Sequence, residues 1–273
     1  MIVRVVRLAA LKFSTDGASI LAQAIAFNAC FATIPFALVL SAMFGFIYGS
    51  GAGDAAALGA IDTFAPAMHD IVAQNLATVV RSRNLSGLVG LAALVWSAKN
   101  VFQTLGYALD RALGITKSRH VVWETIIAVV LVPIACGALI LASAIPVVIS
   151  VIVRLPGLRS LRDLPEVASY AASIAVVFAI SALLYTFLPN RKFSDVRFGL
   201  PGALVTAAGW SIAQVGFAIY TTHTNILHVY GVVSTVFALL LYVYILATIF
   251  LFGAHVSAAV ERETSPPDED LLA

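Results

Sequence analysis

Long apolar runs alternate along this chain with short polar connections. Runs that are almost free of charge occupy residues 22–48, 85–109, 121–150, 167–188, 199–220 and 231–260. Each run reaches the roughly 20 residues that a helix needs to cross a hydrocarbon core of about 30 Å. Lipid offers no hydrogen-bond partner to the backbone, so such runs form helices. The pattern predicts an all-α, polytopic membrane protein whose six transmembrane helices form one domain over residues 21–260.

Three segments lie outside these runs. Residues 1–20 place Arg4, Arg7 and Lys12 on one broad arc of a helix, which predicts an amphipathic helix lying on the membrane surface. Between the first and second spans, charged residues are scattered among apolar ones and Pro66 divides the segment, so we expect amphipathic helices there. The acidic residues 261–273 contain two prolines and predict a flexible tail.

The basic residues indicate the orientation of the chain. Six spans place both termini on one side of the membrane. Ten cations lie on that side: Arg4, Arg7, Lys12, Arg111, Lys117, Arg119, Arg191, Lys192, Arg197 and Arg262. The other side has five: Arg81, Arg83, Arg154, Arg159 and Arg162. Since cytoplasmic loops carry the excess of lysine and arginine, we expect both termini in the cytoplasm.

Composition agrees with a membrane protein and argues against several functional classes. Apolar residues make up 61% of the chain, charged residues 11%, and the mean hydropathy is +0.99, whereas soluble domains are about 25% charged. A net charge of +2 does not indicate a nucleic-acid partner. Cys30 and Cys136 fall inside apolar runs and are interpreted as packing residues.

We predict no enzymatic activity, no cofactor and no metal. His223 and His228 share one short loop, but no nearby Asp, Glu or Cys completes a set of metal ligands. The sequence contains no GxSxG, HExxH, P-loop or GxGxxG motif in a suitable context. RNA hydrolysis needs paired metals or an acid–base pair, and the spans contain almost no carboxylates.

Polar side chains inside the spans are the strongest functional signal. Lys99, Asn100 and Gln103 follow one another at helical spacing in the second span. Gln23, Asn28 and Gln214 lie in other spans and would complete a polar lining. Two interpretations stay open: interhelical hydrogen bonds that hold the bundle together, or a cavity that faces substrate. One cation among amides favours an anionic or amphiphilic ligand.

Basic connections form a second group of candidate residues. Those predicted to contact anionic lipid head groups are Arg111, Lys117, Arg119, Arg191, Lys192 and Arg197. Ordinary topology signals explain them equally well. Three of them lie in the connection at 184–202, where Pro189 ends one helix and Pro201 lies near the start of the next. Tyr185 is expected to anchor the preceding span at the membrane interface.

Four groups of motifs carry a resemblance to a known family. They are AIAFN at 24–28 with Pro35, WSA at 96–98 with ALDR at 108–111, LYTFLPN at 184–190 with GLPGA at 199–203, and VYG at 229–231 with LYVY at 241–244 and GAH at 253–255. The chain resembles the YihY/BrkB family of bacterial inner-membrane proteins, formerly labelled ribonuclease BN-like. Two positions depart from the family, which usually has Tyr at Phe27 and often an acidic residue at His255.

The resemblance implies a six-helix protein of the bacterial inner membrane, with family links to serum resistance and to envelope or lipid export. Together with the polar residues in the spans, it favours a transporter, or an accessory to one, for lipids or anionic amphiphilic envelope components. The alternative is a scaffold that does not transport and organises other envelope proteins. We expect membrane lipids as partners, and other envelope proteins or a second copy of the chain as further candidates.

Overall fold

A computed structural model describes residues 2–32, 59, 83–115, 130, 164–189, 198–223 and 232–264. Within these residues there is helix and turn but no strand, and the all-α prediction is confirmed. The helices are α1 (Ile2–Thr15), an unlabelled helix (Ala18–Ala32), α5 (Arg83–Leu113), α7 (Leu164–Phe187), α8 (Gly199–His223) and α10 (Val232–Thr264). We call the unlabelled one the 18–32 helix.

Three described helices are long and apolar enough to cross a membrane. The crossing segments are Tyr170–Phe187 in α7, Gly199–Tyr220 in α8 and Val236–Thr264 in α10. These helices agree with the predicted membrane class. The first and third predicted spans lie largely outside the described residues, as do the amphipathic segment between spans 1 and 2, Cys136, and most of the tail. Six spans therefore stay a prediction.

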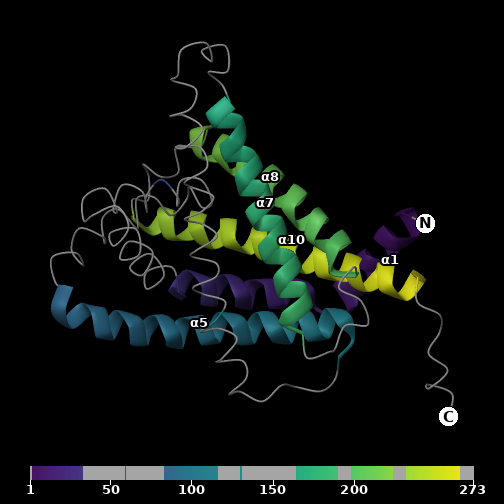
Figure 1. Ribbon diagram of the computed structural model, residues 1–273, viewed down its shortest axis with the longest axis horizontal. Helices are drawn as coiled ribbons and strands as arrows, with labels where there is room; N and C mark the ends of the chain where they lie inside the picture. The colour runs from purple at the N-terminus through teal and green to yellow at the C-terminus, as the bar shows by residue number, and fades with distance from the viewer. Residues whose placement is uncertain are drawn as a thin grey trace.

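Helix α10 is the element around which the others pack. It contacts α8, α1 and α5, and α7 packs in turn against α8. In Figure 1, α5 (blue) and α10 (yellow) run in the same direction, while α7 and α8 lie side by side and cross α10 obliquely. Helix α1 lies against the C-terminal end of α10. This arrangement brings several helix ends together at one end of the bundle.

The main apolar core lies at that end. It joins Ala18 and Ala22 of the 18–32 helix to Leu109 of α5, Leu188 just after α7, and Leu251 of α10. It therefore gathers the start of the 18–32 helix and the C-terminal parts of α5, α7 and α10. These are the parts that the predicted topology places on the same side of the membrane as the N-terminus.

Glycines allow α8 and α10 to approach each other closely. A Cβ added to Gly202 would collide with the Gly253 carbonyl oxygen and the Ser257 hydroxyl, and one added to Gly209 would lie 2.6 Å from the Ile249 side chain. The Gly202 backbone N–H donates a hydrogen bond to Ser257 Oγ at 3.1 Å. Helices in lipid associate through close packing rather than through the hydrophobic effect, so these glycines hold the contact together.

Tyr185 connects three helices from within the bundle. Its side chain is 2% exposed, its hydroxyl donates to the Phe250 carbonyl oxygen at 2.5 Å, and it lies 2.7 Å from Thr206 Oγ1. A phenol has one proton to donate, so the Thr206 hydroxyl donates to the phenolic oxygen. The prediction that Tyr185 faces the membrane interface was wrong, because partners on α8 and α10 satisfy its hydroxyl inside the core.

We expect Gly202→Ala to destabilise the protein by about 1–3 kcal/mol, because the added methyl group has to force two backbones apart. Gly216→Ala on the same helix is the matched control, since a Cβ at Gly216 meets nothing within 4 Å. Thermal unfolding in detergent micelles measures both. Equal melting temperatures for the two variants would contradict the close contact.

Tyr185→Phe should lower the unfolding free energy by about 0.6–1.7 kcal/mol, between the mean and the maximum measured for polar interhelical contacts in a membrane protein. The phenyl ring keeps its packing, so the loss reports on the hydroxyl alone. Tyr170→Phe, at an exposed position (62%) of the same helix, should change nothing. A Tyr185→Phe protein as stable as the wild type would show that the hydroxyl does not join the helices.

Candidate functional site

The polar face of α5 carries the first group of candidate residues. Lys99 and Asn100 are half-buried, Gln103 is exposed, and Trp96, one turn before Lys99, is 69% exposed. Within the described part of the chain, Lys99 has no salt-bridge partner. Lys99 and Gln103 are one turn apart and therefore share a face. This face combines one cation with an amide and an indole.

Asn28 joins the 18–32 helix to this region. Its Nδ2 donates to Thr104 Oγ1 at 2.8 Å, and the Thr104 hydroxyl donates to the Asn100 backbone carbonyl at 2.8 Å. Asn28 therefore makes an interhelical hydrogen bond. Sequence reasoning missed Thr104, although threonine in a helix often bonds the carbonyl four residues earlier and then leaves its oxygen free to accept.

Gln23 and Gln214 do not lie with Asn28 at the polar face of α5. Gln23 is exposed, whereas Ala22 and Ile25 on the same helix are buried. Five residues separate Gln23 from Asn28, which places them about 140° apart around the helix axis. Gln214 is half-buried on α8, whose main neighbours are α7 and α10. The structure thus brings Asn28 to α5, and these two glutamines lie elsewhere.

Of the six residues predicted to contact lipid head groups, one, Arg111, lies in the part of the chain that the structure describes. Arg111, in the last turn of α5, is exposed and donates from Nη1 to the Tyr107 hydroxyl at 3.4 Å. Its side chain is exposed at the end of the bundle where the helix ends gather. The other five, Lys117, Arg119, Arg191, Lys192 and Arg197, lie outside the described residues.

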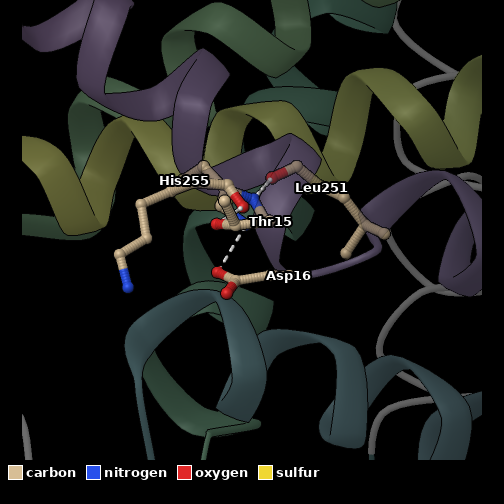
Figure 2. A network of polar contacts seen from close by, with 5 residues as sticks. Thr15, Asp16, Leu251 and His255 are labelled. Carbon is tan, nitrogen blue, oxygen red and sulfur yellow. Dashed lines mark hydrogen bonds and ion pairs between the residues drawn. The ribbon is translucent and has the colours of Figure 1, made fainter.

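A second polar site lies where α1 meets α10 (Figure 2). The His255 side chain on α10 is 2% exposed, and its Nε2 lies 3.4 Å from Oδ2 of Asp16, whose side chain is 18% exposed. The other ring nitrogen, Nδ1, lies 2.7 Å from the Leu251 carbonyl oxygen. A carbonyl only accepts hydrogen bonds, so Nδ1 carries a proton and donates it to Leu251.

Apolar contacts enclose this pair. The Phe13 ring meets the imidazole edge-on with ring centroids 5.5 Å apart, and Val5 and Ala9 of α1 pack with Val256 of α10. In the sequence, His255 stands out only as a departure from the family, and nothing singles out Asp16. An ionisable residue in an apolar span is a functional signal, and His255 satisfied that rule.

Comparison with known proteins gives a family and several relatives. The family model described as Virulence factor BrkB matches residues 9–272. The ribonuclease-like protein YfkH of Bacillus subtilis strain 168 is 25% identical over 221 residues, which cover 78% of this chain and 80% of YfkH. A UPF0761 membrane protein of Photobacterium profundum is 28% identical over 260 residues, 91% of this chain and 78% of that protein.

A UPF0761 membrane protein of Pseudoalteromonas translucida is 26% identical over 205 residues, covering 73% of this chain and 66% of its own length. No solved structure matches this chain. The family model covers nearly the whole chain, including α5, α10 and both polar sites. The chain therefore belongs to the Virulence factor BrkB family of integral membrane proteins.

Proposed function

We propose that this protein lies in the bacterial inner membrane with both termini in the cytoplasm, and transports, or helps to transport, lipids or anionic amphiphilic envelope components. The observation that carries the proposal is the half-buried Lys99 in the middle of α5, with no carboxylate to neutralise it among the described residues. Membership of a membrane family whose model covers nearly the whole chain supports it.

The position of Lys99 in α5 makes its insertion into a membrane energetically costly. It lies 16 residues after Arg83 and 14 before Leu113, at the ends of α5, or about 21–24 Å from either end at 1.5 Å per residue. Within the predicted span 85–109 it lies ten residues, or about 15 Å, from the nearer end, which is more than a lysine side chain spans. Helix α5 is not among the three described helices apolar enough to cross a membrane, so its crossing is part of the proposal; a lysine at the centre of a membrane helix costs about 2.5–3.5 kcal/mol to insert. An anionic ligand would offset that cost.

The exposure of the face favours an amphiphile over a small ion. Trp96 and Gln103 on either side of Lys99 are exposed, so the cation lies next to the surface of the helix bundle. A lipid that approaches sideways would place its head group at Lys99 while its chains stay in the bilayer. Trp96 would pack against those chains, as aromatic residues do at amphipathic boundaries.

The ribonuclease-like name belongs to the Bacillus relative, and we do not extend it to this chain. Within the described residues no group of three or more His, Cys, Asp or Glu side chains is placed to hold a metal ion. The proposal is non-enzymatic and rests on the polar face of α5. Highly purified protein that cleaves labelled RNA, with the cleavage lost in a matched variant, would overturn this part of it.

Lys99→Ala should reduce the flux of a fluorescent anionic lipid across reconstituted liposomes by about tenfold or more, because the variant loses the only cation of the α5 polar face. Arg7→Ala, which removes the same charge from exposed sequence on α1, is the matched control and should keep wild-type flux. Wild-type flux in a correctly inserted Lys99→Ala protein would contradict the proposal. No flux in the wild type, with stable complexes of other envelope proteins, would favour the scaffold.

Asn28 and Thr104 should behave as structural residues. We expect Asn28→Ala and Thr104→Val to destabilise the protein, with a coupling energy of about 0.6–1.7 kcal/mol in a double-mutant cycle, because both belong to one hydrogen bond. Lipid flux should stay close to wild type in folded samples. Additive effects on stability would show that the bond does not hold the 18–32 helix to α5.

A further inference from the structure

Asp16 lies at a joint between helices. Its backbone N–H donates to the Lys12 carbonyl at 2.9 Å and so closes α1, and Gly17, with φ of 66°, turns the chain. The 18–32 helix begins immediately afterwards, with the Ile20 N–H bonded to the Gly17 carbonyl at 3.0 Å. A helix N-terminus carries partial positive charge. Asp16 lies between this positive end and the C-terminal end of α1, whose partial charge is negative.

The hydrogen-bond geometry leaves room for one proton between the two side chains. Nδ1 of His255 keeps its proton on the Leu251 carbonyl. Neither Nε2 nor Asp16 Oδ2 makes a hydrogen bond within the described part of the chain, and they face each other at 3.4 Å. A neutral Nε2 and a carboxylate oxygen are both acceptors. One added proton turns this pairing into an attraction, whichever of the two atoms carries it.

The ligand of this pair is a proton rather than a metal ion. A structural zinc site uses four ligands, and in the described residues no third His, Cys, Asp or Glu joins Asp16 and His255. His255 is buried, whereas the Asp16 side chain is 18% exposed, although the oxygen that faces His255 is itself buried. The other charged groups described on α1, α5 and α10 are Arg4, Arg7, Lys12, Lys99, Asp110, Arg111, Glu261, Arg262 and Glu263.

We propose that Asp16 and His255 form a proton-binding site that holds the end of α1 against α10, and that loss of the proton loosens this joint. Besides the pair, α1 is held by an apolar cluster and by an exposed ion pair between Arg4 and Glu263 at 3.0 Å. Without the proton, two acceptors face each other at a buried position, and such unsatisfied groups are costly. The inference does not depend on the proposed transport function.

Hydrogen–deuterium exchange on the full chain in lipid nanodiscs tests this, with protection factors corrected for the intrinsic exchange rate. Between about pH 5.5 and about pH 8.5, where histidines change charge, protection of α1 should fall by about tenfold or more in the wild type. Asp16→Asn should remove this dependence, because an amide N–H donates to a neutral Nε2 at every pH. Protection of α7 serves as the internal reference.

Glu263→Gln is the matched control, since it breaks the other ion pair between α1 and α10. It should lower α1 protection slightly at every pH and keep the wild-type pH dependence. Protection of α1 that is independent of pH in the wild type, or pH dependence that survives in Asp16→Asn, would overturn the proposal.

If Asp16→Asn fails to fold, NMR of the wild type with ¹⁵N-labelled histidine side chains still tests the proposal. The chain has five histidines, and the signals absent from His255→Gln identify His255. Nδ1 should stay protonated throughout the titration, and the proton should leave the Nε2–Asp16 pair as α1 protection falls. A His255 ring protonated on Nε2 alone, or proton loss without any change in α1, would refute the proton site.

Discussion

The close approach of α8 and α10 is the contact on which the described structure depends. Gly202 and Gly253 let the two backbones meet, and a Cβ at Gly253 would lie 2.6 Å from the Tyr185 hydroxyl oxygen. The same glycine thus makes room for the hydrogen bonds by which Tyr185 joins α7 to both partners. Two residues further along α10, His255 meets the end of α1. One small-residue contact therefore sets the positions of four helices.

Several hydroxyls in the described helices are satisfied within their own helix. Hydroxyls donate to the carbonyl four residues earlier in three helices: Thr186 to Ala182, Ser211 to Ala207, and Thr248 to Tyr244. A hydroxyl bonded in this way costs little in lipid and needs no functional explanation. Lys99 has no salt-bridge partner among the described residues, and His255 Nε2 and Asp16 Oδ2 have no hydrogen bond there, although His255 Nδ1 donates to the Leu251 carbonyl four residues earlier. The free-energy cost of burying polar groups without partners therefore distinguishes the two candidate sites from the hydroxyls that bond within their own helix.

Sequence alone predicted the class of the protein and the approximate positions of the described helices, because run length and turn residues such as Pro189 and Pro201 act locally. It did not predict which way a side chain points. Lipid and core are equally apolar, so hydrophobic periodicity does not show that Tyr185 faces inward. The contact between Asp16 and His255 joins residues far apart in the chain, and no local pattern signals it. The polar face of α5 was predictable, because Lys99, Asn100 and Gln103 follow one another on one helix.

The 18–32 helix physically connects the two polar sites. It begins directly after Asp16 and Gly17, and Asn28 on the same helix bonds to Thr104 of α5. Eleven residues separate Gly17 from Asn28, or about 16 Å along a helix, and α-helices of this length move as stiff rods. A tilt that starts at the joint with α10 would therefore reach the Asn28–Thr104 bond, which lies two residues before Gly106, where α5 approaches Leu188 of the core. Coupling between the sites requires that this rod has two arrangements, and the proton at Asp16 and His255 is the feature of the described structure that would select between them.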